Sequence, residues 1–89
     1  MGEVVASLKL LPAEASVDLE ALKKALPERL PSGVRIHRFE EEPIAFGLKA
    51  LIVHVVLPED QTGKMEELEE ALKKVEGVSE VEVLMVRRF

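Results

Sequence analysis

The sequence predicts an α+β fold in which strands and helices follow one another in the order β-α-β-β-α-β. Apolar residues recur at every second position in several short segments, which is typical of strands. In two other segments they recur with 3,4 spacing, which is typical of helices. Glycine, proline and aspartate separate these segments and indicate turns. With 89 residues, the chain is expected to form a single domain, residues 1–89.

Four strands are expected from these patterns. The first spans residues 3–11 and stops at Pro12, because proline cannot donate to a strand ladder. The second, residues 34–41, alternates between apolar and polar side chains, which indicates a strand exposed on one face. The third, residues 48–57, is almost continuously apolar, which is typical of a central strand with neighbours on both edges. The last, residues 78–86, alternates again.

Two helices are expected between these strands. The first begins after Asp18, a preferred N-cap residue, and is expected to end or kink near Leu26, because Pro27 follows. The second is expected to end at Gly77, a preferred C-cap residue. It carries one apolar stripe, made by Met65, Leu68, Leu72 and Val75.

The order of these elements is the split βαβ pattern of ferredoxin-like folds. Right-handed crossovers place both helices on one face of a four-stranded antiparallel sheet. In this topology the first and third strands lie in the middle of the sheet. The strong apolar character of the third strand agrees with a central position.

The composition excludes several classes of protein. The chain has no cysteine, which excludes disulfides, thiolate chemistry and cysteine–zinc sites. Its net charge of −5 argues against direct binding to a nucleic acid backbone and favours a protein partner with a positive surface. No apolar run reaches the roughly 18 residues of a membrane span, and the N-terminus lacks the pattern of a signal peptide. We therefore expect a soluble, cytoplasmic protein that does not enter a membrane.

Side chains suited to covalent chemistry are sparse. No hydroxyl residue lies in a strand–elbow–helix context, and no glycine-rich phosphate cradle is present. His37 and His54 fall on neighbouring strands and are expected to be structural, because the spacing suggests no third metal ligand. Glu40, Glu41 and Glu42 point to alternating faces and are expected to form a solvated strand end. The sequence thus indicates no catalytic residue, no metal site and no cofactor.

The connection between the second and third strands is unusual because its tip is apolar. Such connections normally face water and are polar. Here Pro43 and Gly47 flank Ile44, Ala45 and Phe46; proline restricts the chain on one side and glycine frees it on the other. Two interpretations stay open at this point: Phe46 folds back over the core, or the tip is a fixed apolar knob that binds a partner.

These residues resemble a known family. The segment EEEPIAFGLKALIVHVVL, preceded by VDLEALKKAL and followed by GVSEVEVLMVRRF, closely resembles the archaeal translation elongation factor 1-beta family and its guanine-nucleotide-exchange domain. The similarity runs from Val4 to Phe89. The loop signature Pro-Ile-x-Phe-Gly-hydrophobic-Lys is its specific part, whereas the helices and alternating strands are generic.

The resemblance implies a ferredoxin-like fold and a function without covalent chemistry. It implies release of GDP from the GTPase elongation factor 1-alpha, so that GTP can load. In this family an aromatic residue of the loop contacts the GTPase, and Phe46 matches it. A lysine one residue before the C-terminus enters the magnesium region of the partner in eukaryotic members, and Arg88 takes that place here. The expected partner-binding residues are Pro43, Ile44, Ala45, Phe46, Gly47, Arg87, Arg88 and Phe89.

Arginine at position 88 departs from the family pattern, since a guanidinium is bulkier than an ammonium group and binds as a fork. Two other functions remain as alternatives. A ferredoxin-like regulatory module that binds a small molecule predicts a ligand pocket at a dimer interface. A small acyl-phosphate hydrolase would need an asparagine to orient water beside an arginine, and the chain has no asparagine.

Overall fold

The computed structural model describes residues 2–58 and 63–88. Its elements confirm the predicted α+β class and the predicted order. They are β1 (Glu3–Pro12), α1 (Leu19–Arg29), β2 (Arg35–Pro43), the single 3-10 turn η1 (Ala45–Gly47), β3 (Lys49–Pro58), α2 (Lys64–Lys73) and β4 (Val78–Arg88).

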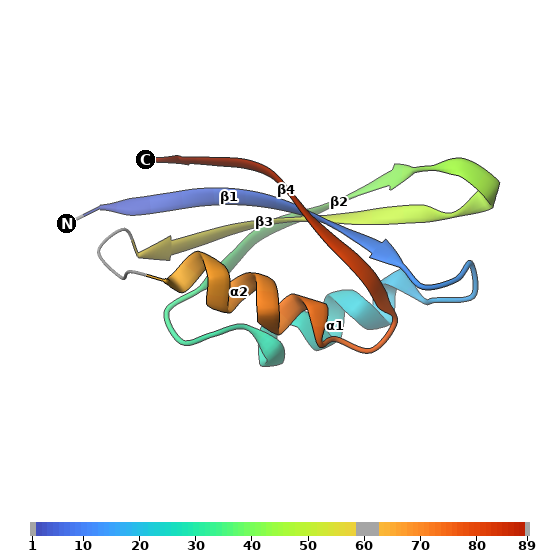
Figure 1. Ribbon diagram of the computed structural model, residues 1–89, viewed down its shortest axis with the longest axis horizontal. Coiled ribbons are helices and arrows are strands. Elements are labelled where there is room, and N and C mark those ends of the chain that lie inside the picture. The colour runs from blue at the N-terminus through green and yellow to red at the C-terminus, as the bar shows by residue number, and fades with distance from the viewer. Residues whose placement is uncertain (1, 59–62, 89) are drawn as a thin grey trace.

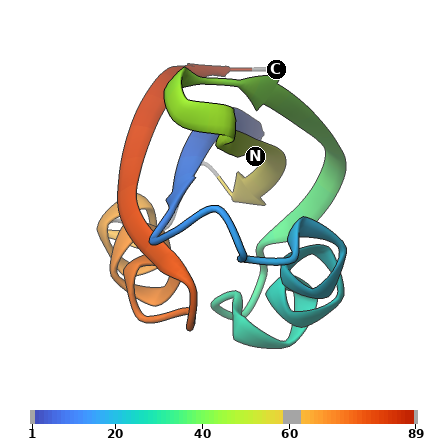
Figure 2. The same cartoon turned by 90° about the vertical axis from the view of Figure 1, so that its right-hand side faces the viewer.

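The strands form one antiparallel sheet in the order β2-β3-β1-β4. The predicted central position of the first and third strands is therefore confirmed. Both helices cover one face of this sheet, and in the described residues no helix covers the other face (Figures 1 and 2). This is the ferredoxin-like arrangement predicted from the element order.

The hydrophobic core fills the space between the sheet and the two helices. Alternate residues of each central strand point into it, as the period of two requires, while the helices contribute the leucines of their 3,4 stripes. A fully buried leucine contributes about 2 kcal/mol relative to an exposed one. The fully buried large side chains are Leu8, Leu10, Leu26, Leu51, Val53, Val55, Leu68 and Leu72.

The predicted helix ends are wrong in two places. Helix α1 runs through Pro27 and ends at Arg29. Proline removes one hydrogen bond near the end of the helix, and the fully buried Leu26 holds this turn in place. Helix α2 ends at Lys73, so Gly77 is not its C-cap. Gly77 instead turns the chain into β4 with a φ of +94°. At the start of α1 the prediction holds, because the Asp18 side chain accepts a hydrogen bond from the Glu20 N–H at 2.9 Å.

Strands β2 and β4 extend further toward their C-terminal ends than the sequence patterns predict. Strand β2 continues to Pro43, which is paired with Lys49 at the start of β3. The connection between these strands, predicted as residues 42–47, therefore consists of residues 44–48. Strand β4 continues to Arg88, so Arg87 and Arg88 belong to the sheet. No helix in the described part of the chain is long and apolar enough to cross a membrane.

Candidate functional site

The loop between β2 and β3 is closed by its own backbone. The Ile44 N–H donates to the Leu48 carbonyl at 2.8 Å, and the Leu48 N–H donates to the Ala45 carbonyl at 3.2 Å. The loop is therefore a tight, hydrogen-bonded end of the β2–β3 hairpin. Its tip projects from the right-hand end of the molecule in Figure 1.

Phe46 at this tip has two costly features. Its backbone has φ 61° and ψ 32°, the left-handed region, which costs an ordinary L-residue about 1–2 kcal/mol. Its ring is 96% exposed, although burial of a phenylalanine is worth about 1.5–3 kcal/mol. The interpretation in which Phe46 folds back over the core is wrong. Strained, exposed apolar residues of this kind occur where a protein meets a ligand or partner.

The neighbours of Phe46 hold it in this position. Gly47 also has a positive φ, 74°, a conformation that glycine adopts without penalty. Ile44 is half-buried under the loop, whereas Pro43 and Ala45 are exposed. The structure thus brings these five predicted residues, 43–47, together on one short hairpin end.

The three successive glutamates before the loop form ion pairs with β1, with α1 and within β2 itself. On the helix-free face Glu42 accepts from Lys9 of β1 at 3.3 Å, and Glu40 accepts from Arg38 at 3.0 Å. On the opposite face Glu41 accepts from Lys23 of α1 at 2.9 Å. The alternation of faces is confirmed, and Glu40 and Glu41 are exposed as predicted, but their ion pairs were not predicted. Ion pairs across strands and to α1 fix the base of the loop.

The Lys23–Glu41 pair shifts the ionisation of both partners. The hydrogen bond that Lys23 donates to Glu41, with a smaller contribution from the one to Glu20, raises the pKa of Lys23 above its ordinary value. The hydrogen bond from Lys23 lowers the pKa of Glu41 below its ordinary value. Each charged form is therefore favoured by the other.

Three side chains on the helix-free face, those of Ser7, His54 and Glu40, are linked in series by hydrogen bonds. Ser7 Oγ lies 2.7 Å from His54 Nδ1, and His54 Nε2 lies 2.8 Å from Glu40 Oε1. A serine, a histidine and a carboxylate in series are also the parts of a hydrolase triad. Here, however, the serine is only 4% exposed and lies on a central strand, whose backbone N–H groups are used in the sheet. We therefore interpret these hydrogen bonds as structural, because they give the buried hydroxyl group of Ser7 a hydrogen-bond partner.

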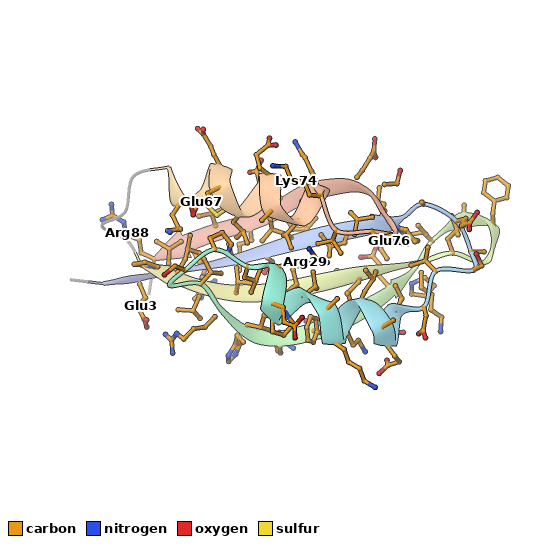
Figure 3. All side chains as sticks on the ribbon, turned by 90° about the horizontal axis from the view of Figure 1, so that it is seen from below. Glu3, Arg29, Glu67, Lys74, Glu76 and Arg88 are labelled. Carbon is orange, nitrogen blue, oxygen red and sulfur yellow. The ribbon has the colours of Figure 1, made fainter. Side chains whose placement is uncertain are left out.

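Arg87 and Arg88 lie at the end of β4, opposite Val5 and Val4 of β1. Figure 3 shows Arg88 at the same end of the molecule as Glu3. Both arginines line a groove of about 690 Å³ on the helix-free face. Phe89 lies outside the described residues. The lining of this groove also includes Arg35, Arg38, His37 and His54, a basic and histidine-rich set that the sequence patterns did not reveal.

The predicted site residues fall in two places and not in one. The loop joins β3 at Lys49. Arg88 lies level with Leu57 near the other end of β3, because Val4 of β1 is paired with Leu57 on one side and with Arg88 on the other. Eight residue steps of a strand span about 26 Å, and the longest axis of the molecule is 43 Å. Figure 1 shows the end of β4 and the β2–β3 loop at opposite ends of the molecule. In residues 2–58 and 63–88, no cluster of three metal-ligating side chains occurs.

Comparison with known proteins agrees with the loop signature. Residues 5–89 match the model of the EF-1 guanine nucleotide exchange domain. Elongation factor 1-beta of Methanothermobacter thermautotrophicus is 54% identical over 89 residues, with 100% of this chain and 99% of the relative covered. The same-named protein of Staphylothermus marinus is 47% identical, with the same coverage.

A solved structure with the same architecture has little sequence in common with this chain. The C-terminal domain of the MgtC protein from Mycobacterium tuberculosis superposes with a TM-score of 0.63 at 15% identity, covering 99% of this chain and 88% of that one. This likeness concerns the fold alone. The family match spans nearly the whole sequence, including the Phe46 loop and the end of β4. The chain belongs to the EF-1 guanine nucleotide exchange domain family.

Proposed function

We propose that residues 1–89 act as one exchange domain that releases GDP from elongation factor 1-alpha by protein–protein contact. The observation that carries the proposal is Phe46, an exposed aromatic ring held in a left-handed backbone conformation on the family's signature loop. Binding of this kind needs no covalent step and no cofactor. The proposal places the protein in the cytoplasm and gives it a protein partner, with no direct contact to nucleic acid.

The thermodynamic requirement on such a factor is simple. A factor promotes exchange if it binds the nucleotide-free GTPase more tightly than the GTPase with GDP and Mg²⁺. To weaken the binding of GDP to the GTPase a thousandfold, the factor must bind the nucleotide-free form about 4 kcal/mol more tightly than the GDP-bound form. An aromatic anchor that becomes buried in a partner typically accounts for about 2 kcal/mol or more of the binding free energy. Phe46 can therefore supply a large part of the binding, but a second contact is needed.

The proposed second contact is the end of β4. Arg88 takes the place of the family lysine there and belongs to the strand, which fixes its backbone. Phosphates and acidic magnesium ligands surround the nucleotide of a GTPase, so a cation delivered to that region competes with the metal. Because the Phe46 loop joins β3 at Lys49 whereas Arg88 lies level with Leu57 near the other end of β3, the partner must contact this domain at two separated places.

Release of fluorescent GDP from purified elongation factor 1-alpha tests the proposal. The wild-type chain is expected to accelerate release, Phe46→Ala and Arg88→Ala to lose much of this effect, and Arg88→Lys to keep most of it. Arg29→Ala serves as the matched control, since Arg29 is an exposed arginine on α1. Melting temperatures report whether each variant is folded. Wild-type chain that leaves the release rate unchanged would overturn the proposal.

A further inference from the structure

The groove on the helix-free face gathers most of the arginines of this chain. Four of the five arginines and both histidines line it, and Glu3 is the one acidic residue in the described part of its lining. This described lining therefore has an excess of three positive charges, in a chain whose net charge is −5. Arginine, more than lysine, binds phosphate and carboxylate groups through a planar fork of donors. The lining indicates an anion as the ligand.

A bulge in β2 brings two of these arginines to the same face. The register of β2 against β3 shifts by one residue between Ile36 and Arg38, which makes His37 an extra residue of β2. Arg35 and Arg38 are three positions apart and would point to opposite faces of a regular strand. Because of the extra residue, both point to the helix-free face, where their side chains are 65% and 60% exposed. Bulges that re-aim a side chain are common beside functional sites.

One row of four paired residues crosses the sheet and shapes the groove. From β2 to β4 it consists of Arg35, Val56, Val5 and Arg87. Neighbouring strands lie about 4.8 Å apart, so the backbones of the two arginines are about 14 Å apart, with two short valines between them. Short side chains in the middle and long cationic ones at both edges make this face concave. The floor of the groove is therefore apolar and its walls are positively charged.

A second row of the same face adds another cation to the β2 wall. From β2 to β4 it consists of Arg38, His54, Ser7 and Met85. Along β3 it lies two residues, or about 7 Å, from the first row. Arg88 also lines the groove, at the end of β4. Guanidinium groups thus stand at both edges of the sheet, above one shared floor.

The guanidinium groups of the β2 wall keep donors for a ligand. Arg35 donates to Glu3, and Arg38 Nη1 lies 3.0 Å from Glu40 Oε1. A guanidinium group has five N–H donors, so neither ion pair uses all of them. Both ion pairs are exposed to water and therefore weak. An incoming anion can bind the remaining donors and compete with the two carboxylates.

We propose that this groove binds a small ligand that carries two or more phosphate groups. Arginine binds phosphate oxygens in pairs, so arginines on opposite walls can each hold a phosphate of one ligand. The groove volume of about 690 Å³ lies within the range of small-molecule sites, about 300–1,000 Å³, and favours a small molecule over a nucleic acid strand. The diphosphate group is common to nucleotides and inorganic polyphosphates, and the valine floor offers an apolar surface to a nucleoside.

The proposal does not depend on the proposed exchange function. Arg35 and Arg38, on which its test relies, lie outside the proposed contact with the GTPase. Binding is measured on the chain alone, so a failure of the exchange proposal and a failure of this one are distinguishable.

Isothermal titration calorimetry of the full chain at low salt tests binding, with pyrophosphate as the probe. Wild type is expected to bind pyrophosphate more tightly than inorganic phosphate, which reaches fewer arginines, and binding should weaken as salt is added. Adenosine diphosphate and guanosine diphosphate form the second arm. Tighter binding of either nucleotide than of pyrophosphate would show that the nucleoside contacts the floor. Equal or weaker binding would identify the ligand as an inorganic polyphosphate.

Four variants locate the ligand. Arg35→Gln and Arg38→Gln each remove one guanidinium group and are each expected to bind pyrophosphate about fivefold more weakly. Glu3→Gln removes a negative charge from the lining and is expected to bind it more tightly, a gain that misfolding cannot produce. Arg29→Gln is the matched control and should bind like wild type, because Arg29 is the one arginine outside the groove and lies on α1 (Figure 3).

Three results would overturn the proposal. Wild-type chain that binds neither pyrophosphate nor a nucleoside diphosphate at millimolar concentration has no such site. Binding that is unchanged in Arg35→Gln, Arg38→Gln and Glu3→Gln takes place elsewhere on the surface. A chain that binds an RNA oligonucleotide but none of the small phosphates has a nucleic acid surface instead. Circular dichroism shows whether each variant is folded.

Discussion

The Lys23 ammonium group of α1 donates to Glu41 Oε2 of β2 at 2.9 Å, and this bond ties the first helix to the strand that leads into the Phe46 loop. Glu20, one turn before on the same helix, accepts from the same ammonium group at 3.0 Å. Lys23 therefore bridges two carboxylates. Both sides of the bridge are partly exposed, so its effect on stability is small and is screened by salt.

The first prediction concerns the pH dependence of this bridge. The pKa of Glu41 is lowered from 4.5, so its stabilising effect is present above that value and is lost as the pH falls through the folded-state pKa. The pKa of Lys23 is raised from 10.5, so its effect is present below that value and is lost as the pH rises through the folded-state pKa. The free energy of unfolding of wild type should exceed that of Glu41→Gln between these limits.

Urea denaturation at several pH values measures this difference. It should be present near pH 7, shrink in acid and in strong base, and decrease in high salt. Glu28→Gln is the matched control, because no ion pair is formed by Glu28 in the described part of the chain. A Glu41→Gln variant with wild-type stability at every pH would show that the bridge contributes nothing.

Local sequence patterns predict the helices and strands of this protein, but not the strand pairing and ion pairs that join one element to another. The apolar run of β3 and the 3,4 stripe of α2 reflect burial, which is a local property of each segment and is readable from it. The extension of β2 through Glu42 depends on its pairing with Ala50 of β3, a partner distant in sequence. Likewise Glu41 meets Lys23 only because α1 packs beside β2. Such contacts follow from the assembled fold.

The candidate site was predictable to a similar degree. The sequence Pro43–Gly47 marks an apolar tip, yet the left-handed backbone of Phe46 depends on closure of the hairpin and has no signal in the residue type. The predicted last strand stops at Val86, two residues before the observed end of β4, because two terminal arginines do not continue the alternating pattern. The register with β1 places them there.

The second prediction concerns the buried hydroxyl of Ser7. Removal of its hydroxyl group leaves His54 Nδ1 without its partner at 2.7 Å, and a buried polar group without a hydrogen bond costs about 1–3 kcal/mol. Ser7→Ala should therefore lower the free energy of unfolding by about 1 kcal/mol. The exchange rate should be unaffected, since this link is not part of the proposed contact surface.

A double-mutant cycle with His54→Phe distinguishes the hydrogen bond from general packing. If the two side chains act through this bond, Ser7→Ala should cost less when His54 is already replaced. Strictly additive effects would show that the serine and the histidine stabilise the sheet independently.

The third prediction compares two glycines with similar backbones and different surroundings. Gly77 has φ +94°, and a Cβ there would lie 3.3 Å from Val17 Cγ1. Gly63 has φ +81°, and a Cβ there would meet no atom of the described residues within 4 Å. Both alanine variants carry the left-handed penalty of about 1 kcal/mol, but only Gly77→Ala also presses on Val17. Thermal unfolding should show that Gly77→Ala is the less stable variant. Equal melting temperatures would mean that Val17 moves aside without cost.

The last prediction separates the two costs carried by Phe46. Its left-handed backbone is tolerated better by asparagine than by phenylalanine or alanine, while its ring is too exposed to stabilise the core. Phe46→Asn should therefore raise the free energy of unfolding by up to about 1 kcal/mol, whereas Phe46→Ala keeps the backbone cost and should stay within about 0.5 kcal/mol of wild type. Both variants lose the ring, so both should weaken binding to elongation factor 1-alpha by about 2 kcal/mol, a factor of about 30. Urea denaturation and GDP release, measured on the same preparations, check the two effects. If Phe46→Asn is stabilised and still promotes exchange at the full rate, the ring is not part of the binding surface. If Phe46→Ala is strongly destabilised, the ring supports the fold.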